Sequence, residues 1–472
     1  MKIAVLGSEG VSRIDGAARR ILERTGVEVP HEEMLALFAK AGARVDAAAG
    51  RVRIPSALVD ECLGSSGKTF TLHGRDRARA ASFGTGSRNY NSTAGQAFWV
   101  EPTGERRFAR LADVTEAARI GDALPRIDIV GAMADPHEVD ISYRCVEVAA
   151  ALLRETAKPV MFWFHDRASA AWVVELLEIV TGGGAARFPP AYPFLEPISP
   201  LRFPRTGIDL LFETCKVPLP VPIGPMAQTG MSAPATIAAT LAQETAEILA
   251  GICAVQLIRP GTPVCFGGIP HAFDMRTTQL VFSGPEQGLM AVAMTEIGKA
   301  YGLPVYVNVG LTDSKAVDAQ AGLEIGVSLV LGALAGADIF GHLGIAGVDQ
   351  GSSLEMLVFQ HEAVEFVERI LGSFEIDDET LALDLIDRVG PGGNFIAEEH
   401  TVRHFRRELW SPSILDRSFW EKWVEKGRPD AAAKARERLE ALRARREPKP
   451  LPGDVERDIG KLLDRARSAL RR

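Results

Sequence analysis

Short apolar runs alternate with longer stretches of helical periodicity through the middle of the chain, between about residues 112 and 350. The apolar runs are continuous, which is typical of parallel strands that are buried on both faces. Roughly 35 to 45 residues separate most of them, the spacing expected of repeated strand–helix units. The predicted strands are 127–133, 160–164, 221–226, 264–269, 305–309 and 339–341, and the predicted helices are 137–157, 166–183, 233–258, 284–301 and 316–336.

Two architectures contain such units, a closed (β/α)8 barrel and an open doubly wound sheet. An open dinucleotide-binding sheet usually carries a GxGxxG motif after its first strand, and this chain has none. We therefore predict an α/β fold whose centre is a (β/α)8 TIM barrel over residues 81–350. A helical extension over 1–80 and a helical segment over 351–472, packed on the barrel, complete the predicted organisation.

Both flanking regions show helical patterns only. Predicted helices at the N-terminal end cover 13–24, 30–41 and 55–62. Ser352 and Glu355 have the spacing of a capping box and precede an apolar stripe. Residues 429–472 mix arginines and acids with Ala and Leu, which predicts a solvated helical pair. The stripe consists of Met356, Phe359, Ala363, Phe366, Val367 and Ile370.

Composition narrows the class of protein. The 472 residues are 46% hydrophobic and 24% charged, which excludes a mainly disordered, collagenous or coiled-coil chain. A net charge of −8 argues against a nucleic-acid binder. The five cysteines include no CxxC pair and indicate reduced thiols in a cytoplasmic protein. The first ten residues lack a signal-peptide pattern, and every long apolar run contains a charge or a breaker, so no membrane span is predicted.

In a barrel, chemistry takes place at the carboxyl ends of the strands and in the loops that follow them. Glu196 and Asp313 occupy such positions and are the candidate catalytic carboxylates. A carboxylate like Glu196 at the barrel mouth can hold a cationic substrate or take a proton. His271 and His342 each follow a glycine-containing strand end and are candidate substrate-binding residues. Because neither lies in an HxH or HExxH pattern, no protein-bound metal is predicted.

Aromatic side chains also gather near predicted strand ends. Phe162 and Phe164 flank a tryptophan, and Tyr90 lies in a polar segment without core periodicity. Such rings are often core residues, and a polar segment often forms a surface turn. Their functional alternative is a cage for a quaternary ammonium group, whose charge is attracted to ring faces. We therefore treat these three as candidate substrate-binding residues.

Lys315 raises an alternative, a barrel lyase or aldolase that forms a Schiff base. A nucleophilic lysine needs desolvation to lower its pKa. Lys315 instead lies among Asp313, Ser314 and Asp318, and this polar neighbourhood argues against that chemistry.

Several motifs together are similar to those of the trimethylamine methyltransferase superfamily, particularly its members without pyrrolysine that demethylate glycine betaine and related amines. No single motif is decisive, but their order and spacing extend from about residue 12 to 425. They are Arg20-Ile21-Leu22-Glu23-Arg24-Thr25-Gly26-Val27, Ser87-Arg88-Asn89-Tyr90, Gly310-Leu311-Thr312-Asp313-Ser314-Lys315 with Asp318 and Gln320, Gly390-Pro391-Gly392-Gly393-Asn394-Phe395, His400-Thr401 and Trp410-Ser411-Pro412.

This resemblance implies a (β/α)8 barrel that transfers a methyl group from an amine to the Co(I) of a small, separate corrinoid protein. Cobalamin would therefore come from the partner, with no tightly bound metal in this chain. Tyr90 and His342 resemble the betaine-contacting Tyr and His of the family. Pyrrolysine, which the family's trimethylamine enzymes carry near the position of Asp313-Ser314-Lys315, is absent here. A quaternary amine is therefore the expected donor, and glycine betaine, proline betaine, carnitine and butyrobetaine all remain open.

Three hypotheses follow. The first is a corrinoid-dependent methyltransferase that acts on a quaternary amine, and we expect it to be a homo-oligomer. The second is a lyase or aldolase that uses Lys315 or Glu196. The third is a non-catalytic protein that binds betaines or the corrinoid partner.

Overall fold

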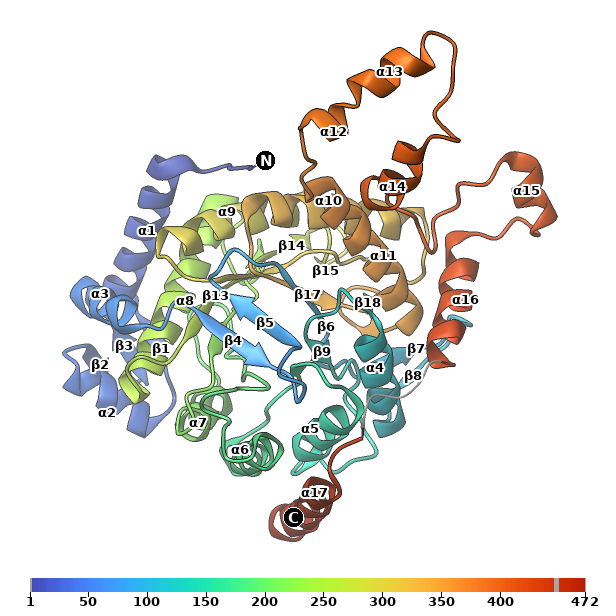
Figure 1. Ribbon diagram of the computed structural model, residues 1–472. Helices are drawn as coiled ribbons and strands as arrows, with labels where there is room; N and C mark the ends of the chain where they lie inside the picture. The colour runs from blue at the N-terminus through green and yellow to red at the C-terminus, as the bar shows by residue number, and fades with distance from the viewer. Residues whose placement is uncertain (1, 445–449, 472) are drawn as a thin grey trace.

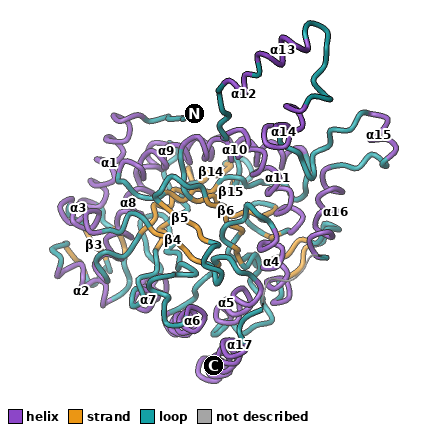
Figure 2. The backbone as a smooth tube through the Cα atoms, viewed as in Figure 1, coloured by secondary structure: helices purple, strands orange, loops and turns teal. Residues whose placement is uncertain are grey.

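A computed structural model describes residues 2–444 and 450–471. Short parallel strands occupy the centre and helices surround them (Figure 1), while loops make up much of the remaining backbone (Figure 2). The largest sheet has five parallel strands in the order β11-β13-β16-β17-β6, and a second parallel pair is β10-β9. These strands are β6 (Asn89–Ser92), β9 (Val130–Gly131), β10 (Val160–Met161), β11 (Val221–Ile223), β13 (Val264–Gly268), β16 (Val305–Asn308) and β17 (Ile339–Leu343).

Three isolated parallel bridges connect the two sheets. One joins Asn91 in β6 to Ile129 just before β9. The others join Val160 in β10 to Ala191, and Leu195 to Ile223 in β11. Each parallel segment is thus connected to two neighbours in a cyclic order, and the fold is α/β and TIM-barrel-like. The sequence indicated a strand end before Glu196 but not the bounds of this segment, because the prolines in and around it cannot donate to a ladder.

One large helix follows each parallel segment. The predicted alternation is therefore present, although 111–123 and 205–214 were not predicted to be helical, and the predicted 137–157 helix begins only at Arg144. The helices are α4 (Leu111–Ala123), α5 (Arg144–Glu155), α6 (Arg167–Thr181), α7 (Arg205–Thr214), α8 (Ile237–Ile258), α9 (Pro285–Ala300), α10 (Ala319–Ala335) and α11 (Leu354–Leu371).

Local capping explains where several of these helices begin. Asp166 and Asp318 each accept a hydrogen bond from a backbone N–H in the first turn of α6 and α10. At α11 the capping residue is Ser353, whose side chain accepts from the Met356 N–H, so the predicted cap at Ser352 was one residue early. In the predicted stripe of α11, Phe366 and Ile370 are exposed, while Met356, Phe359 and Val367 are buried and Ala363 is partly buried against the core.

The N-terminal extension contains the three predicted helices and, in addition, strands that the sequence did not predict. Strands β1, β3 and β2 form a small antiparallel sheet, and β4 and β5 form a hairpin. The elements are α1 (Gly7–Arg24), β1 (Val27–Glu28), α2 (Glu32–Lys40), β2 (Arg44–Asp46), β3 (Arg51–Arg53), α3 (Ser56–Ser65), β4 (Phe70–His73) and β5 (Ala80–Phe83).

The β4–β5 hairpin covers the amino-terminal ends of the parallel strands. Its Leu72 and Phe83 belong to the same buried cluster as Tyr192 and Tyr306. The His73 N–H donates to the Pro189 carbonyl, ahead of the strand-like segment. The apolar side chains of the hairpin therefore close this end of the interior.

Short strands at the opposite end form the walls around the carboxyl ends of the parallel strands. They make one three-stranded sheet, β12-β14-β15, and one four-stranded sheet, β18-β19-β7-β8. Their bounds are β7 (Phe98–Val100), β8 (Arg106–Phe108), β12 (Gln228–Thr229), β14 (His271–Asp274), β15 (Gln279–Val281), β18 (Ile345–Ala346) and β19 (Gly351–Ser352).

The C-terminal region is helical, as predicted, but it has two different parts. Residues 372–428, here termed the arm, extend away from the body (Figure 1) and return to α11 at 410–415, where Ile414 is buried, but the arm's four helices contain no buried residue. The last two helices do not form a free solvated pair, because α16 packs against α11 and α4 while α17 packs against α6 and α5. These elements are α12 (Asp378–Leu381), α13 (Leu383–Val389), α14 (Glu399–Glu408), α15 (Trp420–Glu425), α16 (Ala431–Arg443) and α17 (Gly453–Leu470).

Helix α8 is, among the described residues, the one helix long and apolar enough to cross a membrane. Of its most apolar window, 89% is buried inside the molecule, where α8 contacts α1, α3 and α9. It also carries two buried carboxylates, Glu244 and Glu247, that accept hydrogen bonds from surrounding groups. Burial in the protein core therefore accounts for its apolar sequence.

Gly131 in β9 gives a test of the central packing. A Cβ atom there would lie 2.0 Å from the Thr93 carbonyl oxygen and 2.2 Å from the Ser92 carbonyl oxygen, both of which are backbone atoms. We expect Gly131→Ala to lower the free energy of unfolding by about 1–3 kcal/mol. Gly326→Ala in α10 is the control: no atom lies within 4 Å of its Cβ position, so it should raise stability by about 0.5–1 kcal/mol. Chemical denaturation measures both, and equal effects would contradict the described packing.

Candidate functional site

A cavity of about 460 Å³ lies at the carboxyl ends of the parallel strands. It is lined by residues that follow β10, the 191–195 segment and β11, together with the start of α7. Glu196, a predicted catalytic residue, is one of its lining residues, as is Phe164. Trp163, Phe194, Met226 and Gln228 also line it.

Aromatic rings form one wall of this cavity and connect it to the interior. Trp163 and Phe194 meet edge to face at 6.1 Å between ring centroids, and Phe194 contacts Tyr306 in the same way at 5.4 Å. The Trp163 indole N–H donates to the Gly95 carbonyl at 2.9 Å. This hydrogen bond fixes the plane of the indole ring, because the only donor of the side chain is used.

His342 stands beside this wall. Its ring stacks on Trp163 at 6.3 Å, and its Nε2 lies 2.8 Å from the Tyr306 hydroxyl. Burial lowers the pKa of His342 to about 4, so the ring is neutral at pH 7. Burial also raises the pKa of Tyr306, which keeps its hydroxyl protonated. The buried Nδ1 of His342 has no hydrogen-bond partner among the described residues.

His342 reaches the interior because of a local irregularity. The register of β17 against β6 shifts between Phe340 and Leu343, so the strict alternation of side chains is broken there. Gly341 is required at this point, since a Cβ atom would lie 1.9 Å from the Tyr306 hydroxyl oxygen. The glycine before His342 thus makes room for its hydrogen-bond partner.

His271 lies in a second polar group, which is also buried. Its Nε2 is 3.2 Å from the Asn308 side-chain amide nitrogen, and its ring stacks on Phe282 at 4.7 Å. Burial lowers the pKa of His271 to about 3, with a smaller contribution from repulsion by His342. The Asn308 Oδ1 atom is buried and has no partner in the described part of the chain. The two histidines predicted from sequence are therefore brought close together in the same interior.

Two carboxylates with raised pKa values accompany the rings. Glu196 is solvent-accessible through the cavity, but the surrounding protein desolvates its carboxylate and raises its pKa to about 7. Burial, together with the charge of Glu196, raises the pKa of Asp349 to about 7. The Gln96 amide donates to Asp349 Oδ1 at 2.7 Å. Asp349 and Val348 both have positive φ values, of 58° and 59°, which for a β-branched valine is a strained conformation.

Asp313, the second predicted catalytic residue, is not among the residues that line the cavity. Its Oδ1 accepts from the Phe282 N–H at 2.9 Å, and burial raises the pKa of Asp313. Through Phe282 it fixes the ring on which His271 stacks. Lys315 is exposed, and its ammonium donates to the Asp313 carbonyl. It lacks the burial that would activate a Schiff-base lysine.

The structure does not bring Tyr90 to the cavity. Tyr90 is a buried residue of β6 and not a surface turn, and its hydroxyl donates to Glu368 of α11 at 2.6 Å. The same carboxylate forms an ion pair with Arg88, and the Tyr90 ring contacts Phe340. Tyr90 thus faces the helix layer, and its predicted role in substrate binding has no support from this position.

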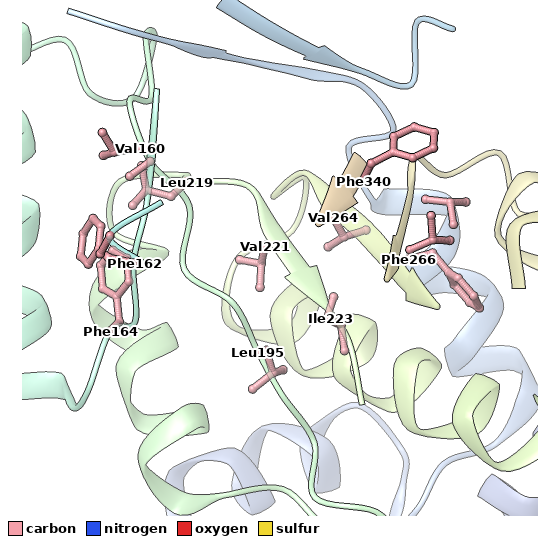
Figure 3. Packing of buried hydrophobic residues seen from close by; sticks show 14 of the residues in the cluster. Val160, Phe162, Phe164, Leu195, Leu219, Val221, Ile223, Val264, Phe266 and Phe340 are labelled. Carbon is pink, nitrogen blue, oxygen red and sulfur yellow. The ribbon is translucent and has the colours of Figure 1, made fainter. Parts of the chain in front are cut away.

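Phe162 and Phe164 face the helix layer as well. Their rings stack on one another at 4.8 Å. Figure 3 shows them with Val160 among buried hydrophobic residues, and all three belong to the large core that underlies the helices. Phe164 also reaches the edge of the cavity. Trp163 between them points the other way, because successive side chains of a strand lie on opposite faces.

Sequence reasoning therefore missed several residues of the site. Trp163 could have been found by testing both faces of the aromatic run. Tyr306 could have been found from its place in a predicted strand. Asn308 could have been found in the same way, because it lies at the end of that strand. Gln96 and Asp349 carry no sequence signal, because each depends on a loop conformation that periodicity does not reveal.

The fold and the cavity define a TIM-barrel-like α/β protein with a ligand-sized site at the carboxyl ends of its strands. Residues 1–470 match the family model of trimethylamine methyltransferase (MTTB). The chain therefore belongs to this methyltransferase family, and the resemblance inferred from its motifs is confirmed.

Individual relatives match over nearly the whole chain. The glycine betaine methyltransferase of Desulfitobacterium hafniense strain Y51 is 29% identical over 428 residues, which cover 90% of this chain and 89% of the relative. The trimethylamine methyltransferase MttB of D. hafniense strain DSM 10664 / DCB-2 is 28% identical over 465 residues, covering 98% and 94%. MttB1 of Methanosarcina acetivorans is 28% identical, covering 100% and 97%.

Solved structures support the fold. The monomethylamine methyltransferase MtmB of Methanosarcina barkeri superposes with a TM-score of 0.55 at 11% identity, covering 93% of this chain and 89% of that one. A hydroxylamine complex of MtmB gives a TM-score of 0.54 at 12% identity, with the same coverage. At such low identity the likeness concerns the fold alone.

The raised pKa of Glu196 predicts a pH-dependent stability. Between pH 4.5 and about 7 the folded protein binds a proton at Glu196 that the unfolded chain has released, so stability falls as pH rises through this window. We expect Glu196→Gln to raise Tm above pH 7 and to leave it unchanged below pH 4.5. Scanning calorimetry at pH 4, 6 and 8 measures the effect. Glu105→Gln in the turn before β8 is the control, and a gain independent of pH would contradict the assignment.

Proposed function

We propose that the protein transfers a methyl group from a quaternary amine, glycine betaine or a related betaine, to the Co(I) of a corrinoid protein by in-line displacement. The observation that carries this proposal is the combination of Trp163, Phe194 and Glu196 around one cavity, with Asp349 close enough to Glu196 for their charges to interact. Aromatic faces and carboxylates together attract a cation that has no N–H donor. The family membership and the betaine- and trimethylamine-specific relatives agree with this reading.

The fold in this proposal is a closed (β/α)8 barrel. Its eight parallel segments would be β6, β9, β10, 191–195, β11, β13, β16 and β17, and the sheet pairings together with the isolated bridges between them support closure. One helix from α4 to α11 follows each segment. The cavity then occupies the position where barrel enzymes carry their active sites.

The two ends of a betaine need different partners. Its ammonium group would lie against the Trp163 and Phe194 rings, with Glu196 and Asp349 supplying negative charge. Its carboxylate needs a donor, and His342 offers one. When the Tyr306 hydroxyl donates to Nε2 of His342, the proton of the neutral ring is on Nδ1, the buried atom without a partner. A betaine carboxylate would satisfy that N–H.

The chemistry requires little acid–base work from the chain. A quaternary nitrogen leaves as a neutral tertiary amine when the C–N bond breaks, so no proton has to be delivered. The corrinoid of the partner supplies the nucleophile that accepts the methyl group. The residues of this chain hold the C–N bond in line with the cavity opening, exclude water and stop stabilising the amine once its charge is lost.

Glu196 acts in this scheme as a counter-ion rather than a general acid. Its pKa near 7 means that a bound cation lowers the cost of the ionised form, so binding and ionisation support each other. Asp313 is a positioning residue that acts through Phe282 and His271.

In the same proposal the partner is a small corrinoid protein, and the chain assembles as a homo-oligomer. The protein works in the cytoplasm, where its five buried cysteines are free thiols.

The experiment that tests the proposal is turnover with a panel of methyl donors. Purified protein is incubated with reduced free cobalamin and, separately, with glycine betaine, proline betaine, carnitine, butyrobetaine and trimethylamine. We expect one betaine to give methylated cobalamin and the demethylated amine in equal amounts, with trimethylamine inactive. Binding of a betaine without turnover would favour the non-catalytic binding protein. Turnover of trimethylamine alone would contradict the quaternary-amine donor.

The role of the aromatic wall has its own test. We expect Trp163→Ala to weaken binding of the active betaine by about 5- to 30-fold, corresponding to ~1–2 kcal/mol for one desolvated ring face. Calorimetry measures Kd for the betaine and for its neutral carbon isostere. Phe162→Leu, which faces the helix layer in the segment just after β10, is the matched control and should change neither. A loss of equal size for the isostere would show that the ring supplies packing and not attraction to the charge.

A further inference from the structure

The arm has no hydrophobic core of its own. None of the residues in its helices α12, α13, α14 and α15 is buried. Large apolar side chains such as Ile396 and Phe419 are more than 80% exposed, at 83% and 88%. What connects α12 to α14 in the described structure is mainly polar contact between surface groups. Exposed ion pairs of this kind contribute about 0–1 kcal/mol each, which is little to fix the relative position of two short helices.

Three side chains with metal-binding groups meet at this junction. His400 and His404 lie one turn apart on α14, so both imidazoles are on the same face of the helix. Glu379 of α12 faces them, and one ligand atom from each of the three residues lies within 4.8 Å of the other two. This is the one group of three or more such residues found in the described part of the chain.

The distances fit a small tetrahedral site. His404 Nε2 is 3.1 Å from Glu379 Oε1, and the two imidazole rings are 4.3 Å apart. In a tetrahedral zinc site with bonds of about 2.0–2.1 Å, neighbouring ligand atoms are roughly 3.3 Å apart. His400 now has Nε2 3.1 Å from the Glu379 carbonyl oxygen, so its ring already lies beside the residue that supplies the third ligand.

We propose that Glu379, His400 and His404 bind a Zn²⁺ ion that fastens α12 to α14 and so orders the arm. Two imidazole nitrogens and one carboxylate oxygen form a donor set that favours Zn²⁺ over the hard cations Mg²⁺ and Ca²⁺, which prefer oxygen ligands. Glu379 is 51% exposed, which leaves the fourth position open to water. A metal would provide the constraint that small helical units without a core usually need.

The expectation of no protein-bound metal was drawn from the surroundings of His271 and His342, from the lack of a CxxC pair and from the family resemblance. The spacing of His400 and His404 was overlooked, because the third ligand lies 21 positions from His400 and on another helix. A pair of histidines four apart on a helix is a recognisable half-site, but the sequence does not reveal its carboxylate partner.

One positively charged group competes with the metal. Arg403 Nη2 is 3.0 Å from the same Glu379 oxygen that would bind zinc. Glu399 lies 3.9 Å from the Arg403 guanidinium and offers it another partner. Metal binding therefore displaces an exposed ion pair of small value. Removing the arginine should tighten zinc binding.

Titration of the full chain with Zn²⁺ tests the site. After treatment with a chelator, calorimetry should show one Zn²⁺ bound per chain and no comparable binding of Mg²⁺. We expect His400→Ala and His404→Ala each to weaken binding by roughly 100-fold, and Arg403→Ala to strengthen it. His137→Ala, an exposed histidine on the body, is the matched control and should leave binding unchanged. No saturable binding, or binding that survives both histidine substitutions, would overturn the proposal.

Limited proteolysis supplies a readout that does not depend on activity. The arm carries arginines such as Arg388 and Arg406 at which trypsin cleaves. We expect Zn²⁺ to slow cleavage within residues 372–428 in the unaltered protein and in Glu399→Gln, but not in His404→Ala. Mass spectrometry identifies the cut sites. Equal protection in all three proteins would show that any bound zinc does not fasten the arm.

Discussion

The alternation of side chains along the parallel strands determines what the cavity contains. In a strand buried on both faces, each residue points either into the interior or toward the helices. Trp163 and Tyr306 point inward and form the wall and its hydrogen bond, whereas Phe162 and Phe164 fill the helix layer. Where alternation alone would misplace a residue, a register shift corrects it, as it does for His342. The site thus depends on strand geometry more than on any single side chain.

The second determinant is the cost of placing charge where water is scarce. Glu196 and Asp349 both have pKa values near 7, because the surrounding protein disfavours their ionised forms. Ionising them in the folded protein without a ligand therefore costs stability. Neutral histidines add no charge to offset them. Such a site gains stability when a cation arrives. In functional sites such a loss of stability is commonly exchanged for function.

The sequence predicted the strand–helix alternation well because continuous apolar runs and capping residues are local signals. The motifs also identified the family. Strand β6 was not predicted, because Asn89-Tyr90-Asn91-Ser92 resembles a polar loop. Segment 191–195 was expected only as the strand end before Glu196, because it contains Pro193 and lies between Pro190 and Pro197. Glu196, His271 and His342 were selected because they follow predicted strand ends, and their role in a site stays a prediction. Tyr90 was expected in a polar loop but is a buried residue of β6, and a sequence cannot show which face of an unrecognised strand is turned inward.

The β4–β5 hairpin bears on the order in which a methyl donor and a protein partner can bind. Because Leu72 and Phe83 fill the amino-terminal end of the interior, the cavity opens only toward the carboxyl ends of the strands among the described residues. A methyl donor and a protein partner would then share one entrance. In the proposed reaction the donor has to load before the partner docks, and the demethylated amine is retained until the partner departs. The kinetic mechanism would accordingly be sequential and ordered, with the small molecule first in and last out.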